Sequence, residues 1–233
     1  MTRSLMVSLI VAGPLLIGGC GGYTAKYVVD DVSLAQVPAD EKKAIFEAQN
    51  DVVVAKADKA KADSDADSTK AEIALAQAER DQAKLEVEKA KLEGDMAEKA
   101  KDVNRQQAAA EKRRVAEMGK RAAEAKVDSL EAKRDWQRAI ADQAEAHIMS
   151  AVSKVELEKA KLAQAKNIKP SKDFDPAKFA EDYDRRVSKY DESRIEADRK
   201  KGKFDRATSE WTNLKMQFDQ ASAPPPPPAA PAK

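Results

Sequence analysis

Cysteine and histidine each occur only once in this sequence of 233 residues, glycine occurs eight times, and aromatic residues make up 5%. A single cysteine excludes a disulfide framework, and a single histidine argues against an all-protein metal site or a His-dependent catalytic triad. Large apolar side chains are too few and too dispersed for a compact core in a chain of this length. These absences point away from enzymes and cofactor-binding proteins.

An excess of charge of one sign is also absent. Lys and Arg number 42 and Asp and Glu number 41, so the formal net charge is +1. A nearly neutral chain is not expected to bind nucleic acid by general electrostatic attraction. The abundant residues are alanine, lysine, glutamate and aspartate, a composition typical of coiled coils and long helices. We therefore predict an all-α fold, an elongated antiparallel coiled coil or slender helical hairpin bundle with disordered termini.

The first residues have the features of an export signal. Residues 1–20 read MTRSLMVSLIVAGPLLIGGC, in which Arg3 supplies a positive charge ahead of the apolar run 5–17. A helix over this run rises about 20 Å, which is too short for a hydrocarbon core about 30 Å thick. The pattern therefore favours a signal peptide over a membrane-spanning helix.

The end of this segment, Ile17-Gly18-Gly19-Cys20, resembles the lipobox of bacterial lipoproteins. The resemblance implies that a diacylglyceryl group is transferred to the thiol of Cys20, that residues 1–19 are removed, and that the new amine is acylated. Two or more acyl chains hold a protein firmly on a membrane. Gly21 stands where an aspartate would favour the inner membrane in enteric bacteria, so the resemblance implies the outer membrane. The alternative is an ordinary secretory signal with a chance cysteine.

Beyond the signal, residues 20–37 are predicted to be a lipidated extended tether. Pro38 suits a first helical position, and we expect a long alanine-rich helical coiled-coil region over residues 38–167. No proline occurs between residues 69 and 167. A continuous helix over that range would be about 150 Å long.

A break is predicted at residues 63–69. This run, DSDADST, contains residues that hydrogen-bond their own backbone and form helices poorly, and Thr69 and Glu72 have the spacing of a capping box. The alternative is one uninterrupted helix. Gly94 and Gly119 are the next places where the chain could fold back.

Apolar residues near 3.5-residue spacing predict the packing faces of this region. The first seam contains Leu75, Ala78, Leu85, Leu92, Met96 and Val103, and the second contains Ile140, Ala144, Ile148, Ala151, Val155, Leu162 and Ala165. Seams this narrow must be covered by another helix. Either intrachain folding or a second copy can supply it, so a homo-oligomer stays open.

The C-terminal part is predicted to fold back. Pro170 lies in a turn over residues 168–175, and Asp175 with Pro176 has the pattern of a helix start. A return helix over 176–221 carries an aromatic stripe that should pack near Trp136, Ile140, Ile148 and Val155 of the long region. Residues 222–233 form a proline-rich tail of polyproline II type.

Candidate chemical sites are few. Aspartates alternate in the 63–69 run as they do in a calcium loop, but Ser68 and Ala74 replace the glycine and glutamate that an EF-hand requires. His147 has no second histidine or cysteine with which to share a metal. No phosphate-binding loop or nucleophile elbow is present in the sequence. We predict no cofactor, no metal and no catalysis.

In overall plan the mature chain resembles the murein lipoproteins of Gram-negative bacteria, which combine a lipidated cysteine, an alanine-rich heptad helix and a terminal lysine. In that family the ε-amine of this lysine is joined to peptidoglycan, which makes Lys233 a candidate attachment site; the alternative is a solvated lysine. This chain is several times longer and ends Pro-Ala-Lys where the family has Tyr-Arg-Lys.

These features predict a non-enzymatic outer-membrane lipoprotein that faces the periplasm and acts as a structural spacer or tether of the envelope. The expected partners are the membrane, through the lipid on Cys20, and peptidoglycan or an envelope protein complex, with no nucleic acid. The alternative function is an accessory coiled-coil subunit that docks on a secretion, efflux or motility complex.

Overall fold

The computed structural model describes residues 23–223, and within this range the chain is all α, as predicted, with no strand. Three long helices make the fold: α1 (Lys43–Lys99), α2 (Val103–Ala165) and α3 (Pro176–Ser222). Two short 3-10 helices precede them, η1 (Asp31–Leu34) and η2 (Ala39–Lys42). The described part of the molecule is therefore an elongated antiparallel helical bundle.

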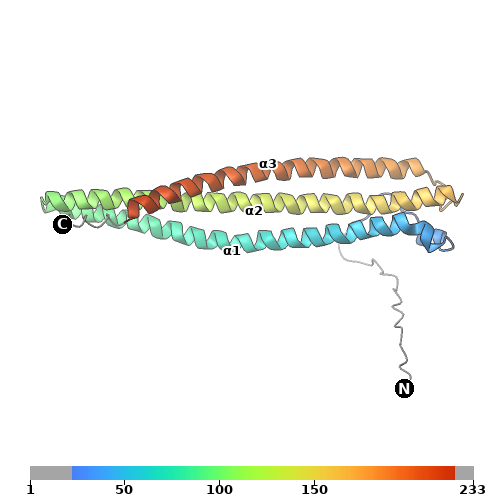
Figure 1. Cartoon of the computed structure of the whole chain (residues 1–233), viewed down its shortest axis with the longest axis horizontal. Helices are drawn as coiled ribbons and strands as arrows, with labels where there is room; N and C mark the ends of the chain where they lie inside the picture. Colours follow the sequence, from blue (N-terminus) through green and yellow to red (C-terminus); the bar gives the residue numbers. More distant parts are fainter. Residues whose placement is uncertain (1–22, 224–233) are drawn as a thin grey trace, which may run out of the picture.

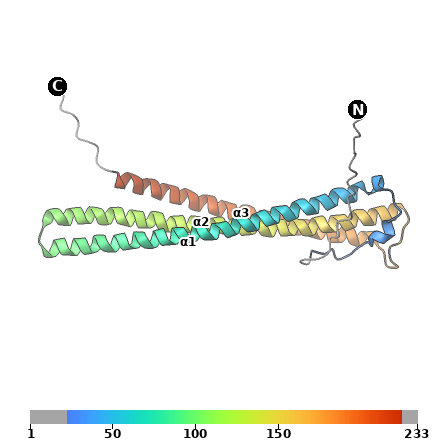
Figure 2. The ribbon, with the colours of Figure 1, turned by 90° about the horizontal axis from the view of Figure 1, so that it is seen from below.

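The bundle is an open layer rather than a closed triangle of helices. Figure 1 shows α2 between α1 and α3, and both outer helices pack along α2. At 1.5 Å per residue, the 63 residues of α2 give a rod about 95 Å long. We call the end with the α1–α2 turn the tip and the end with the α2–α3 turn the base. Because α3 stops short of the tip, the tip is a bare two-helix hairpin (Figure 2).

The chain reverses at residues 100–102, so a continuous helix over residues 69–167 is excluded. Lys101 adopts a left-handed conformation with φ of 55°. The N–H of Asp102 donates to the carbonyl oxygen of Ala97 at 3.2 Å, which closes a Schellman motif at the end of α1. The side chain of Asp102 then accepts from the N–H of Arg105 at 3.0 Å and caps α2. A turn of this kind can form without glycine or proline.

The predicted break at residues 63–69 is wrong, because α1 runs through them without interruption. The hydroxyls of Ser68 and Thr69 donate to the carbonyl oxygen of Asp65 at 2.9 and 3.1 Å, so these side chains are satisfied inside the helix. Thr69 is also fully buried against α2. Tertiary packing therefore outweighs the low helix propensity of this run.

The second reversal lies where the sequence predicts it. Asn167 has φ of 54°, and the N–H of Ile168 donates to the carbonyl oxygen of Ala163 at 2.8 Å, which forms another Schellman motif. The side chain of Asp175 accepts from the N–H of Ala177 at 3.1 Å and caps α3, whose first residue is the expected proline. Within the predicted tail, residues 224–233 lie outside the described range.

The face of α1 that packs on α2 combines a stripe of small residues with the larger Ile45, Val52, Ile73 and Val87, and it does not contain the predicted leucine seam. The following residues are buried and stand at multiples of seven residues along the helix: Ala48, Ala55, Ala62, Thr69, Ala76, Ala90 and Ala97. Leu75, Leu85 and Leu92 lie on the other side of α1 and are exposed. Small residues at these positions leave room for α2 to pack against α1. The first seam prediction is therefore wrong, although its period is right.

Large aromatic side chains fill the contact between α2 and α3. Trp136 and Phe204 stack with ring centroids 5.5 Å apart, which confirms that the return helix packs beside Trp136. Near the end of α3, the ring of Phe218 lies over Gly119, where an added Cβ would be 2.9 Å from the ring. The absence of a side chain at Gly119 therefore lets α3 pack close to α2.

Most large core residues lie at the base, and part of the predicted extended tether belongs to this core. Val29, Leu34 and Val37 are buried. They join one cluster with helix residues that include Ile45, Val52, Val155, Leu157 and Phe179. The tether prediction is therefore wrong for these residues, because their apolar side chains cover the end of the bundle and remove apolar area from water.

Candidate functional surfaces

The two residues that the sequence singles out, Cys20 and Lys233, lie outside the described residues, so the structure assigns no position to either. The described chain begins at Tyr23 and ends at Ala223. What the structure shows is where the segments that lead to these residues leave the rod.

The other candidates from the sequence are structural side chains. Asp63 pairs with Lys59 at 2.8 Å and Asp67 pairs with Lys70 at 2.6 Å, both along α1. Among residues 23–223, no group of three or more His, Cys, Asp or Glu side chains could hold a metal ion. The ring of His147 stacks on Tyr190 of α3 with centroids 4.9 Å apart.

A buried ion pair on α2, joined by the exposed Asp31, holds the N-terminal segment in place. Glu156 and Lys159 are 8% and 7% exposed, and Nζ of Lys159 lies 2.9 Å from Oε1 of Glu156. The second oxygen of Glu156 accepts from the N–H of Val29 at 2.7 Å, and Lys159 also reaches Asp31 at 2.7 Å. Burial acts to lower the pKa of Lys159, but the hydrogen bonds with Asp31 and Glu156 outweigh it and raise this pKa. We call these four residues the base clamp.

The base clamp fixes where the N-terminal segment leaves the rod. The hydrogen bond with Asp63 raises the pKa of Lys59, and burial opposes this shift. Tyr23 is one of several groups that raise the same pKa further by weaker electrostatic effects. Tyr23 is therefore close enough to Lys59 to act on it electrostatically. From Lys59 to Lys99, the last residue of α1, the helix rises about 60 Å. Lys59 itself lies only about 24 Å along α1 from Lys43, so this part of α1 is closer to the base than to the tip.

A second buried carboxylate joins α2 to α3. Asp182 is 4% exposed and accepts from the hydroxyl of Ser153 at 2.9 Å, and it forms an ion pair with Arg185. Burial acts to raise the pKa of Asp182, but the hydrogen bonds from Ser153 and Arg185 outweigh it and lower this pKa. This carboxylate is held ionised by its partners and joins the two helices.

Lysines of α2 pair with acidic residues of α1 along the rod. The pairs are Lys112–Glu93 at 2.7 Å, Lys126–Glu79 at 2.5 Å, Lys133–Glu72 at 2.7 Å and Lys154–Asp51 at 2.9 Å. Successive pairs are separated by multiples of seven residues on both helices. Each pair is at least partly exposed and contributes at most about 1 kcal/mol, so together they define the antiparallel register more than the stability.

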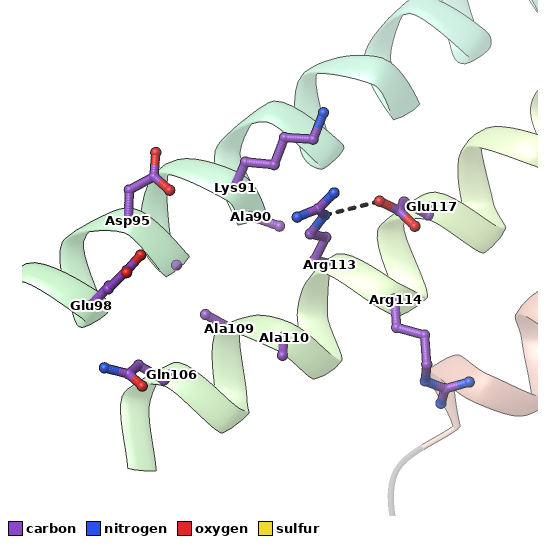
Figure 3. A pocket seen from close by; sticks show the side chains of 11 residues that line it. Ala90, Lys91, Asp95, Glu98, Gln106, Ala109, Ala110, Arg113, Arg114 and Glu117 are labelled. Carbon is purple, nitrogen blue, oxygen red and sulfur yellow. Dashed lines mark hydrogen bonds and ion pairs between the residues drawn. The ribbon is translucent and has the colours of Figure 1, made fainter. Parts of the chain in front are cut away.

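A groove of about 710 Å³ lies between α1 and α2 near the tip (Figure 3). Its walls carry small residues, among them Ala90 and Ala109, and side chains of both charges. Arg113 bonds to Glu117 at 2.9 Å along its own helix. The lining contains no histidine, cysteine or hydroxyl side chain, and its polar members are Gln106 and charged residues of both signs.

The most unusual surface is the outer face of α1. Leu75, Leu85, Leu92 and Met96 are 68%, 64%, 62% and 63% exposed, and we call them the outer stripe. Val103, the first residue of α2, is also exposed at the tip. The sequence identifies these residues as one seam but assigns them to the interior. Exposed apolar residues that gather on one face mark binding surfaces more often than scattered ones do.

Comparison with known proteins adds no relative: no family model, no curated protein and no solved structure matches this chain. Within residues 23–223, no helix combines the length and the apolar character needed to cross a membrane.

Proposed function

We propose that this protein is a non-enzymatic lipoprotein of the bacterial outer membrane. Acylated Cys20 holds it on the periplasmic face, and the helical rod carries a partner-binding surface on the half that includes the tip. It thereby acts as an accessory coiled-coil subunit of an envelope complex. The observation that supports this function most directly is the outer stripe, a set of large apolar side chains that remains exposed on α1.

The route of the N-terminal segment supports the proposed orientation. The base clamp holds Val29 and Asp31 on α2, and Tyr23, the first described residue, is within electrostatic reach of Lys59. A lipid on Cys20 would then lie near the base half of the rod. The arm of about 60 Å from Lys59 to the tip would be free to reach a partner.

The dimensions favour docking over the spanning of an envelope gap. A continuous helix of about 150 Å would suit a spacer, but the fold-back at residues 100–102 shortens the rod to about 95 Å. Its free arm is shorter still. The length that favoured a spacer on the sequence alone is therefore reduced by more than a third. Docking on a partner, by contrast, explains why an apolar face of α1 is exposed.

Lipid attachment is tested by palmitate labelling of the full chain and of its Cys20→Ala variant. We expect label in the full chain and none in the variant, together with sedimentation of the labelled protein with outer membranes. Equal labelling of the two proteins would reject the lipid anchor and, with it, the proposed location.

Docking is tested with a photo-crosslinking residue placed at Leu92 in living cells and a matched control placed at Ile195. Both positions are exposed, at 62% and 66%, but Ile195 is on α3, outside the outer stripe. We expect one partner in near-stoichiometric yield from position 92 and not from position 195. Equal crosslinking at both positions would contradict a defined docking face.

A second candidate function is attachment to peptidoglycan through Lys233, and the end of α3 favours it. Ala223 lines the same surface groove as Glu86 and Lys89 of α1, which are about 40 to 45 Å along α1 from Lys59. The proline-rich tail therefore starts on the half of the rod away from the proposed lipid. Wall attachment predicts that the protein stays with purified peptidoglycan after boiling in detergent, and that Lys233→Arg releases it. Complete release of the unaltered protein would exclude attachment.

A further inference from the structure

Large aliphatic residues stand on both faces of α1, because Ile45, Val52, Ile73 and Val87 are buried while the outer stripe is exposed. Fully buried positions such as Ala48, Ala55 and Ala76 carry alanine, whereas the outer stripe carries leucine and methionine at 62% to 68% exposure. Large aliphatic residues are ordinarily among the most buried in a protein. The outer stripe is therefore better suited to an interface than to the core of this chain.

The spacing of the outer stripe is that of a coiled-coil seam. Leu75 and Met96 are separated by a multiple of seven residues, as are Leu85 and Leu92, and the two sets interleave as positions a and d do. The remaining positions of this repeat carry Ala78, Gln82 and Lys89. In a straight helix this face lies nearly opposite the alanine stripe that contacts α2. Because α3 packs on α2, none of the long helices described here covers it (Figure 1).

Acidic residues border this seam on both edges at seven-residue steps. One edge carries Glu79, Glu86 and Glu93, and the other carries Asp81, Glu88 and Asp95. These are the positions that flank a coiled-coil seam and determine which partner binds. Within residues 23–223, Glu86, Glu88 and Asp95 form no ion pair. Glu79 and Glu93 are paired with lysines of α2, and Asp81 is paired with Arg80 and Lys84 of its own helix.

From this arrangement we infer that the outer stripe binds an amphipathic helix of another protein, whose leucine-rich face is bordered by lysine or arginine. Apolar side chains of that helix would pack between Leu75 and Met96, and its basic residues would pair with the acidic edges. The inference gives the partner chemistry for the docking proposed above, but its test does not depend on the lipid.

The charges disfavour a second copy of this chain as the occupant of the same face. In a parallel pair of α1 helices, acidic residues of one edge would meet acidic residues of the other, and in an antiparallel pair each edge would meet itself. Either arrangement places like charges side by side, which is destabilising. An anionic membrane surface is disfavoured for the same reason.

The test uses two synthetic four-heptad peptides with leucine at positions a and d. One has lysine at positions e and g and the other has glutamate, so like-charge repulsion keeps each peptide from pairing with itself. Binding to the mature chain from residue 20, with Cys20→Ser, is measured by fluorescence anisotropy. We expect the lysine peptide to bind at least tenfold more tightly than the glutamate peptide, and to lose at least tenfold in affinity at high salt.

Three variants locate the binding. Leu85→Gln with Leu92→Gln should reduce the affinity for the lysine peptide at least tenfold, while Ile195→Gln on α3, a position that is also exposed, should leave it unchanged. Glu86→Lys with Glu88→Lys should shift the preference toward the glutamate peptide, a gain that loss of folding cannot produce. Circular dichroism checks that helix content is retained.

Several results would overturn the inference. These are no binding of the lysine peptide, equal binding of both peptides, or equal binding by the stripe variant and the unaltered chain. Self-association that the stripe variant abolishes would identify a second copy as the occupant. If removal of the residues after Ala223 raised the affinity for the lysine peptide, the proline-rich tail would be the occupant of the outer stripe. If the outer stripe bound anionic vesicles, the occupant would be a membrane surface. Absence of lipid on Cys20 would leave the peptide result standing.

Discussion

Replacing Leu75 with alanine should hardly change the stability of the rod, whereas replacing its neighbour Ala76 with leucine should destabilise it. Full burial of a leucine side chain stabilises a protein by about 1.5–3 kcal/mol. Leu75 is 68% exposed, so only about a third of this free energy, or about 0.5–1 kcal/mol, is lost when it is replaced with alanine. The higher helix propensity of alanine offsets a few tenths of this loss. The free energy of unfolding should therefore fall by less than about 1 kcal/mol.

At Ala76 the exposed fraction is 0%, so an isobutyl group has no space unless α1 and α2 separate. Overpacking of this kind costs about 1–3 kcal/mol. Urea unfolding followed by circular dichroism measures both effects, and the Ala76→Leu midpoint should fall by about 0.5–1.5 M. If the leucine seam were the buried one, Leu75→Ala would cost about 2–5 kcal/mol and Ala76→Leu would cost little. That pattern would refute the assignment of the packing face.

Two further predictions concern the buried charges. Lys159→Met leaves the carboxylate of Glu156 buried without a cation, which should lower the free energy of unfolding by about 3 kcal/mol or more. Hydrogen exchange at the amide of Val29, which donates to Glu156, should then accelerate. An unchanged exchange rate would contradict the role of the base clamp. The pKa of Asp182 in the folded protein is lowered from 3.8. The ionised carboxylate therefore stabilises the fold above pH 3.8, and this contribution is lost as the pH falls through the pKa of the folded state. Asp182→Asn should therefore flatten the dependence of unfolding free energy on pH below 3.8, and an unaltered slope would contradict this role.

The turns show how far local sequence predicts this fold. The α2–α3 turn was predictable because Pro170 and the Asp175–Pro176 pair give local signals that no tertiary contact has to supply. The α1–α2 turn was not, since Lys101 adopts its left-handed conformation without glycine. The only local signal there is the capping residue Asp102. The stronger signal at residues 63–69 misled the prediction because the hydroxyl groups there are satisfied inside the helix.

The candidate surface was predictable in its members but not in its position. The spacing of Leu85, Leu92 and Met96 identifies one helical face, yet spacing alone does not say whether that face is turned inward or outward. The base clamp was not predictable, because Glu156 and Val29 are far apart in the sequence and no local pattern connects them. A lysine and a glutamate three residues apart usually form only a solvated pair.

The amino-acid sequence by itself determined the helical class, the period of seven and the start of α3, because these depend on backbone propensities and on contacts within a few residues. Only the tertiary structure decided which of the two faces of α1 is buried. Both faces repeat every seven residues, but alanine lets α1 lie close to α2 and places its carboxylates beside the lysines of α2. The buried face combines an alanine or another small residue at most seventh positions with β-branched residues such as Ile73 and Val87, and the leucines remain on the outer face. The ion pairs between α1 and α2 favour the same orientation of α1.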